Sequence, residues 1–190
     1  MTVNSKSASL HCICNCISGA LVRDQRISSL GLCAVIGIGM LTACDESLTE
    51  SPIPLHKVTY NCNITTINAA MGQANVPNLD TQPGYVLING YRNVSEIIGV
   101  AGLLLYHSAF EDVFYAYDLA CPYCWQQQQK PVQIGMKDDF TAQCAGCQSE
   151  FGAVQYGSPA PTAGPANKEN LILRQYKAHL AGYNTLVVSN

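Results

Sequence analysis

The sequence predicts an all-β domain of small antiparallel sheets, with two cysteine-bearing loops together at one tip and an apolar leader in front. Three observations support this prediction. Short apolar or alternating runs are separated by clusters of Pro, Gly, Asn and Asp, as is typical of strands and turns. Two C-x-x-C pairs, Cys121–Cys124 and Cys144–Cys147, are separated by nineteen residues. The composition changes abruptly at Asp45, and a chain of 190 residues suits one domain plus additional segments.

The leader, residues 1–43, has the pattern of a secretory signal. Its apolar run, Leu30–Leu41, follows two arginines and has the length of a signal-peptide core, which is shorter than a membrane span. A buried core helix is the alternative, but the three glycines in the run disfavour it. The sequence Leu41-Thr-Ala-Cys44 resembles a bacterial lipobox. This resemblance to bacterial lipoproteins implies that residues 1–43 are removed and that Cys44 becomes the lipidated N-terminus.

The same resemblance implies where the protein is located. The mature protein would be lipid-anchored to a membrane of the bacterial cell envelope, with its domain outside the cytoplasm. Residues 44–55 are polar, contain two prolines and are predicted to be a linker, and residues 56–190 are predicted to be the domain. The leader is long, and Val22 is an alternative start that would leave residues 1–21 untranslated.

The net charge argues against nucleic-acid binding, and the position of the N-terminal cysteines argues against a metal site in the leader. Residues 44–190 carry seven Lys and Arg against twelve Asp and Glu, a net charge of −5, so no basic surface for nucleic acid is expected. The pattern His11-Cys-Ile-Cys-Asn-Cys16 resembles a metal cluster but precedes the predicted cleavage site. It is therefore expected to be absent from the mature protein.

The domain begins with predicted strands. His56–Ile64 alternates, with Val58, Tyr60, Cys62 and Ile64 on one face, so it suits a half-buried strand in which Cys62 is a core residue. Thr65–Ala74 is ambiguous and is compatible with a short helix. The remaining predicted elements are a loop at Pro77–Gly84, buried strands at Tyr85–Asn89 and Gly102–His107, a hairpin loop at Ser108–Asp112, a strand at Val113–Leu119, and a final hairpin of Leu171–Ala181 and Asn184–Ser189.

The two C-x-x-C pairs predict a metal site with the ligands Cys121, Cys124, Cys144 and Cys147. A tight turn in each pair directs both sulfurs to one point, and the segment Trp125–Gln143 is long enough for a loop and a hairpin that bring the pairs together. Tetrahedral Zn²⁺ accepts four thiolates, and Trp125 is expected to shield the site. Two disulfide or dithiol pairs are the alternative interpretation.

Residues around these cysteines resemble a Rieske domain over roughly Tyr85 to Asn190. The resemblance rests on Tyr115-Ala-Tyr-Asp-Leu-Ala-Cys121-Pro, on Cys144-Ala-Gly-Cys147-Gln-Ser149-Glu-Phe151-Gly, and on Gly157, Gly164-Pro-Ala166, Leu171, Tyr176 and Leu186–Val188. It implies a Rieske-like fold with a two-loop tip. A Rieske centre binds a 2Fe–2S cluster with two Cys and two His. Here Tyr123, followed by Cys124, and Cys147 occupy the histidine positions.

Few residues outside the cysteines are candidates for catalysis or metal binding. His107 and His179 lie in strand patterns far from the loops, and the acidic pairs Glu111–Asp112 and Asp138–Asp139 lie in predicted turns. The sequence therefore predicts no enzyme but a membrane-anchored Rieske-like module with structural zinc and a binding or assembly role, whose protein partner is not specified. The alternative is an electron carrier with a 2Fe–2S cluster or a single iron. A thiol–disulfide module is a third hypothesis.

Overall fold

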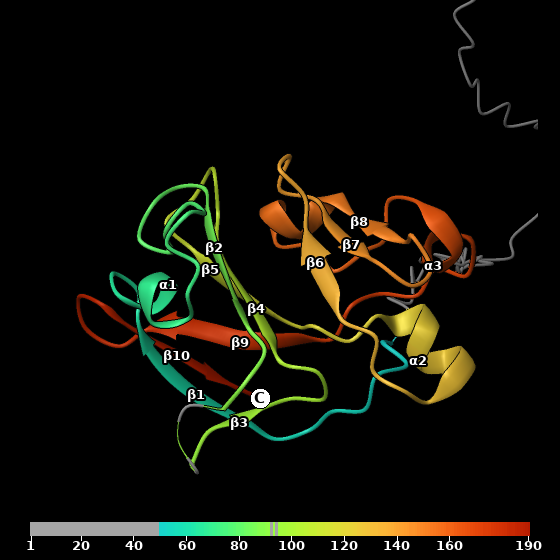
Figure 1. Cartoon of the computed structure of the whole chain (residues 1–190), viewed down its shortest axis with the longest axis horizontal. Coiled ribbons are helices and arrows are strands. Elements are labelled where there is room, and N and C mark those ends of the chain that lie inside the picture. Colours follow the sequence, from blue (N-terminus) through green and yellow to red (C-terminus); the bar gives the residue numbers. More distant parts are fainter. Residues whose placement is uncertain (1–49, 92, 94) are drawn as a thin grey trace, which may run out of the picture. The chain divides into compact units, whose positions relative to one another are not determined.

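Two antiparallel sheets organise the part of the chain that the structure, a computed structural model, describes: residues 50–91, 93 and 95–190 (Figure 1). The predicted signal peptide, its alternative start, the Cys44 lipidation site and residues 44–49 of the predicted linker lie outside these residues.

The larger sheet has seven strands in the order β2-β4-β5-β9-β10-β1-β3 and curls until it is nearly closed. Its strands are β1 (Val58–Asn63), β2 (Gly84–Ile88), β3 (Ile97–Ile98), β4 (Leu103–His107), β5 (Phe114–Asp118), β9 (Gln175–Leu180) and β10 (Thr185–Ser189). The smaller sheet consists of β6 (Ile134–Met136), β7 (Ala142–Cys144) and β8 (Glu150–Phe151). The helices are α1 (Ile67–Ala70), α2 (Pro122–Gln128), α3 (Gly164–Lys168) and the 3-10 helix η1 (Gly152–Tyr156).

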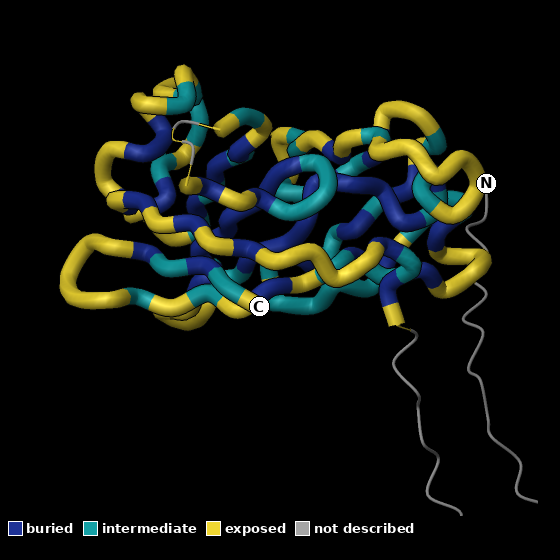
Figure 2. Tube along the Cα trace, turned by 90° about the horizontal axis from the view of Figure 1, so that it is seen from below, coloured by how far each residue is buried: buried dark blue, intermediate teal, exposed yellow. Residues whose placement is uncertain are grey.

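Strand periodicity decides which side chains form the core. Val58, Tyr60 and Cys62 of β1 are buried and alternate with exposed neighbours, which confirms the predicted half-buried strand and the core position of Cys62. Strand β4 is buried along its whole length because both of its faces are covered. Leu103 belongs to the core enclosed by the larger sheet, whereas Leu104 belongs to a second core that also contains three of the loop cysteines. Figure 2 shows this buried interior surrounded by exposed loops.

Side-chain amides cover the outer edge of β2, the first strand in the sheet order. The Gln73 side chain accepts a hydrogen bond from Leu87 N–H at 3.0 Å and donates one to Leu87 C=O at 2.7 Å. Asn68 donates to Tyr85 C=O at 2.8 Å. These amides occupy backbone groups that another strand could otherwise pair with, so β2 is protected against edge-to-edge association.

Residues 119–174 form an insertion between two strands that pair directly, β5 and β9, and we call this segment the cysteine module. The module contains α2, the smaller sheet, η1, α3 and both C-x-x-C pairs. Asp118 N–H donates to Arg174 C=O at 2.8 Å, which closes the neck where the chain leaves and re-enters the larger sheet. Most of the chain between the two neck residues therefore forms its own layer beside the sheet (Figure 1).

The buried Asp118 side chain ties this neck together. Its two oxygens accept hydrogen bonds from Val100 N–H (2.7 Å), Ala101 N–H (3.1 Å), Ala120 N–H (2.8 Å) and Tyr176 O–H (2.8 Å). Burial next to Asp118 raises the pKa of Tyr176, so this hydroxyl remains a donor. Gly99 has φ of +78°, and a Cβ there would collide with the Asp118 carboxylate. The cluster therefore requires glycine at this position.

Residues 51–53, within the predicted linker, contact the domain. Ile53 is fully buried and Ser51 is 7% exposed. The Arg174 guanidinium donates to the carbonyls of both residues at 2.6–2.8 Å. Residues 51–53 thus pack against the domain instead of forming a free tether. Composition alone does not reveal this, because the partner Arg174 is more than 120 residues away.

Most predicted elements are confirmed, and the mostly β character is among them. Strands occupy the predicted runs, and the predicted final hairpin is β9–β10, although residues 171–174 precede the strand. The main difference is α2, a helix where the sequence predicts a tight turn and a loop with the run Gln126–Gln129. No helix in residues 50–91, 93 and 95–190 has the length and apolar character needed to cross a membrane.

We expect Asp118→Asn to lower the free energy of unfolding by about 2–4 kcal/mol, because an amide nitrogen would face buried N–H donors. Tyr176→Phe removes one of the four donors and is expected to cost about 1 kcal/mol. Denaturant unfolding of both variants measures the difference. Equal stability of Asp118→Asn and the unmodified protein would contradict the role of Asp118 at the neck.

Candidate metal centre

The first cysteine pair lies at the start of α2. Cys121 is the N-cap residue in extended conformation (φ −73°, ψ 124°), and Pro122 follows in the first turn, where a missing N–H costs no helical hydrogen bond. Trp125 N–H donates to Cys121 C=O at 2.9 Å and closes the first turn. Cys124 lies within this turn, three residues after Cys121, so both sulfurs emerge on the same side. The predicted tight turn is therefore the first turn of a helix.

The second pair lies on a tight turn after β7, as predicted. Cys144 ends the strand, and Gln148 N–H donates back to its carbonyl at 2.9 Å. Gly146, inside this turn, approaches the first pair closely, since a Cβ there would lie 3.1 Å from Val132 Cγ1 and 3.6 Å from Cys124 Sγ. The β6–β7 hairpin brings this turn to α2, as the sequence predicts, because Cys121 N–H donates to Val132 C=O at 2.8 Å just before β6.

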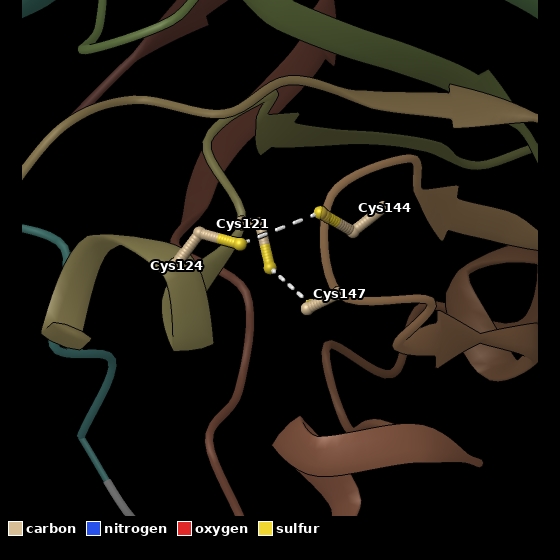
Figure 3. Close-up of side chains that lie close together, drawn as sticks. All are labelled: Cys121, Cys124, Cys144 and Cys147. Atoms are coloured by element: carbon tan, nitrogen blue, oxygen red, sulfur yellow. Dashed lines mark hydrogen bonds between the residues drawn. The ribbon is translucent and has the colours of Figure 1, made fainter. Parts of the chain in front are cut away.

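The four cysteine sulfurs converge on one point (Figure 3). All four lie within 4.8 Å of one another, with Cys121 and Cys147 at 3.5 Å and Cys124 and Cys144 at 3.7 Å. Thiolates bound tetrahedrally to one Zn²⁺ at about 2.3 Å lie about 3.8 Å apart. The four cysteines therefore form a group that could hold a metal ion.

An apolar shell limits access of water to the sulfurs. Cys121 and Cys144 are fully buried, Cys124 is 4% exposed, and Cys147 is half-buried. Three of the cysteines belong to the second hydrophobic core, against which Cys147 packs. Its other members include Leu119, Ile134, Ala142, Phe151 and Leu171. Trp125, which the sequence suggests as a shield, is only partly buried and is not a member of this core.

Ser149 supplies a polar contact outside the four sulfurs. Its fully buried hydroxyl accepts a hydrogen bond from Ala166 N–H at 2.9 Å and lies 3.1 Å from Cys147 Sγ. When Cys147 is a thiolate, the Ser149 O–H can donate to this sulfur. Hydrogen bonds of this kind orient metal ligands and disperse their charge.

Hydrogen bonding and burial shift the pKa values of three of the thiols in different directions. The pKa of Cys144 is lowered to about 5, because Cys121 donates to its sulfur and the N–H groups of Cys147 and Gly146 point at it. The pKa of Cys121 is raised, first by this hydrogen bond and then by burial. Burial raises the pKa of Cys124 to about 12. These hydrogen bonds therefore favour the thiolate form of Cys144 over that of Cys121.

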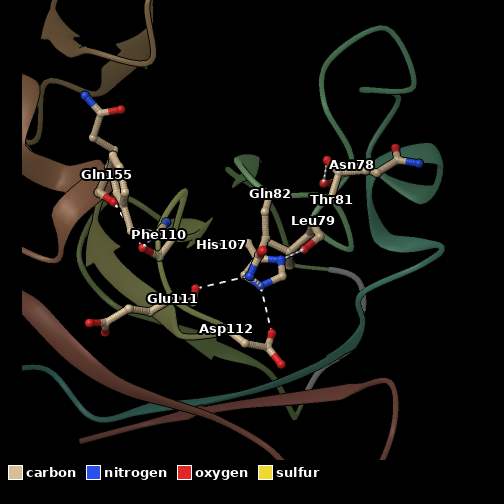
Figure 4. Close-up of polar contacts among 10 residues, drawn as sticks. Asn78, Leu79, Thr81, Gln82, His107, Phe110, Glu111, Asp112 and Gln155 are labelled. Carbon is tan, nitrogen blue, oxygen red and sulfur yellow. Dashed lines mark hydrogen bonds and ion pairs between the residues drawn. The ribbon is translucent and has the colours of Figure 1, made fainter.

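The other residues singled out in the sequence lie in different places. His107 is buried, with Nδ1 3.1 Å from Leu79 C=O and Nε2 3.0 Å from Asp112 (Figure 4). Its ring stacks on Phe114, with the ring centroids 4.1 Å apart. It is a satisfied core histidine, as expected. His179 is exposed on β9, and the pairs Glu111–Asp112 and Asp138–Asp139 are exposed in turns, also as expected.

Asp118 has a role that the sequence did not predict. One signal was present, because Asp118 is the single charged residue in the run Val113–Cys121. A lone acid in an otherwise apolar strand must find donors when it is buried. Its donors come from residues 100–101, 120 and 176, however, and no local pattern connects these positions.

Comparisons with known proteins supply no relative. No protein-family model, no curated protein and no solved structure matches this chain. The resemblances to Rieske domains and to lipoproteins therefore stay predictions.

The cysteines are expected to act as one unit. Single substitutions to serine at Cys121, Cys124, Cys144 or Cys147 should each abolish stoichiometric metal binding and increase proteolysis between Trp125 and Gln148, because structural zinc contributes roughly 10 kcal/mol or more of folding energy. Cys62→Ser is the matched control, since Cys62 lies in the other core, and it should retain the metal. Full metal content in one of the four variants would exclude that residue as a ligand.

Metal uptake is expected to release protons and to weaken as the pH falls. Cys144 is already a thiolate at neutral pH, but the raised pKa values of Cys121 and Cys124 mean that metal must displace at least two protons. The apparent affinity should then fall at least about 100-fold for each pH unit between pH 8 and 6. Metal titration with a competing chelator at several pH values measures this slope. A slope of zero would contradict it.

Proposed function

We propose that this protein is a non-enzymatic, membrane-anchored module in which one metal ion, Zn²⁺, is bound by Cys121, Cys124, Cys144 and Cys147 and joins two loops. The observation that carries the proposal is the packing of all four sulfurs within 4.8 Å. Zinc would add tetrahedral coordination without redox chemistry, and it would hold α2 against the turn after β7.

The sulfur spacing favours one metal ion over a cluster. In a 2Fe–2S centre each iron takes two protein ligands, so the ligands form two pairs on opposite sides of the cluster. The pairs would then be separated by two irons and their bridging sulfides. Sulfurs that all lie within 4.8 Å of one another leave room for one ion at their centre, which supports a mononuclear site.

Zinc and a single iron both accept four thiolates in a tetrahedron, so this geometry does not distinguish them. Cysteines take the place of both histidine ligands of the Rieske pattern. This favours zinc, because the chain then lacks the two-Cys, two-His ligand set of the redox centre. A single rubredoxin-like iron, or a 2Fe–2S cluster after rearrangement of the loops, is the alternative. Either would make the protein an electron carrier.

The Rieske-like interpretation of the fold is part of the proposal. It is supported by the insertion of both cysteine loops between the paired strands β5 and β9, and by Ser149, which lies beside Cys147 in the motif that resembles the second Rieske loop. The proposed role is binding or assembly of a protein partner at a membrane of the bacterial cell envelope. The lipid would be attached at Cys44, and the domain would lie outside the cytoplasm.

Metal analysis and a visible spectrum of the anaerobically purified protein test the metal assignment. We expect a colourless protein with about one zinc per chain. Visible sulfur-to-iron charge-transfer bands together with stoichiometric iron would contradict zinc and support the electron carrier. A metal-free protein whose loops loosen on reduction alone would support the disulfide interpretation instead.

The lipid anchor is tested separately in a bacterial host. Cys44→Ala should abolish labelling by a radioactive fatty acid and leave an unprocessed or released protein, because the thioether acceptor is lost. Ser47→Ala, three residues further on, is the control and should be labelled normally. Unchanged labelling and processing of Cys44→Ala would exclude the lipoprotein assignment.

A further inference from the structure

Sulfur–sulfur hydrogen bonds in the metal centre join one C-x-x-C pair to the other (Figure 3). Cys121 Sγ lies 3.5 Å from Cys147 Sγ, and Cys124 Sγ lies 3.7 Å from Cys144 Sγ. Within residues 50–91, 93 and 95–190, no sulfur–sulfur hydrogen bond joins the two members of the same pair. The four sulfurs therefore form two separate contacts, and each contact connects the start of α2 with the turn after β7.

Backbone hydrogen bonds hold the two loops in register. Cys121 N–H donates to Val132 C=O at 2.8 Å, and Ile134, two residues later, pairs with Cys144 across β6 and β7. Both cysteine segments are therefore attached to residues 132–134. Because the main chain already places these sulfurs in contact, a covalent bond between them would not require the loops to find each other first.

The sulfurs differ in their access to a dissolved oxidant. Cys147 is half-buried, and its two neighbours in the chain, Gly146 and Gln148, are exposed. The other three cysteines of the centre are at most 4% exposed. The Ser149 hydroxyl lies 3.1 Å from Cys147 Sγ and can donate to this sulfur when it is a thiolate, which is the reactive form. An oxidant therefore reaches Cys147 first, and Cys121 is the sulfur in contact with it.

We propose that a disulfide-containing oxidant converts the metal centre into two disulfide bonds, Cys121–Cys147 and Cys124–Cys144, and thereby releases the metal. The two bonds would join the same loops that the metal joins, so α2 would stay attached to the turn after β7. Thiol–disulfide reactions of this kind occur in oxidising compartments such as the bacterial cell envelope. This inference deepens the proposed zinc site, on which it rests, by giving the site a redox-dependent release of its metal.

The reaction balances with two molecules of oxidised glutathione for each site. The Cys147 thiolate attacks one glutathione sulfur, the glutathione disulfide bond breaks, and one glutathione thiolate leaves. Cys121 Sγ, 3.5 Å away, then attacks Cys147 Sγ, breaks the mixed disulfide and releases the second glutathione thiolate. Cys124 and Cys144 react with the second molecule in the same way. The protein thiolates lose four electrons, the two glutathione disulfides accept them, and the metal loses its four ligands and leaves as Zn²⁺.

The test uses the full-length protein, reduced, loaded with Zn²⁺ under anaerobic conditions and then exposed to excess oxidised glutathione. A chromogenic chelator should report release of about one zinc per chain. Trypsin distinguishes the possible pairings, because one C-x-x-C pair lies in residues 93–137 and the other in residues 138–168. Mass spectrometry should therefore find these two peptides linked, through Cys121–Cys147 at early times and through both disulfides at the end.

Protease sensitivity shows whether the loops stay joined. Cleavage between Trp125 and Gln148 should stay within about twofold of the zinc-bound rate after oxidation, and reduction of the oxidised, zinc-free protein should raise it at least about tenfold. Cys62→Ser is the matched control, since Cys62 lies in the other core, and it should behave like the unmodified protein.

Three results would overturn the proposal: oxidised peptides that are not linked, which indicate disulfides within each C-x-x-C pair; zinc that stays bound; or oxidised loops that are cleaved as fast as reduced, zinc-free loops. Failure of the proposed function gives a different result, because the reduced protein would then take up no zinc before any oxidant is added. The peptides formed by oxidation of that sample would still decide the pairing.

Discussion

The buried carboxylate of Asp118 is the interaction on which the arrangement of this domain depends. It accepts four hydrogen bonds, from the segment 100–101, from Ala120 and from Tyr176 of β9. These partners belong to the loop before β4, the entry into the cysteine module and the strand that follows the module. Four donors offset the desolvation of one carboxylate, and removal of the acceptor would leave several buried N–H groups without a partner. Because Ala120 immediately precedes Cys121, this cluster also helps to position the first cysteine of the module.

In the cysteine module, the protein fold positions the four sulfurs, and a bound metal ion would neutralise their charge. The fold brings four sulfurs to metal-binding distance through the start of α2 and the turn after β7, and hydrogen bonds stabilise negative charge on Cys144. Four thiolates in an apolar shell would repel one another strongly, however. A divalent cation would remove this repulsion. The buried position of Cys121 and Cys144 is thus compatible with charge when a cation compensates it, and the same burial would slow metal loss.

The cysteine module has a buried part, which contains the cysteines, and an exposed part, which contains Tyr156. The cysteines are enclosed by a hydrophobic core, whereas Tyr156 of η1 is exposed beside Phe110. The neck at Asp118 and Arg174 is joined by hydrogen bonds both to the larger sheet and to residues 51–53.

The sequence by itself determined the strand pattern and the identity of the four cysteines, because both depend on short-range spacing. A period of two assigns faces to β1, and two C-x-x-C pairs indicate a shared site whatever the intervening structure is. The tertiary structure decided what depends on distant partners. Helix α2 replaces the expected turn and loop, residues 51–53 are packed by Arg174, and Asp118 gathers donors from segments up to 58 residues away. The contact between Phe110 and Tyr156 likewise arises only when two layers meet. Such contacts have no local signature, since their free energy comes from groups that folding alone brings together.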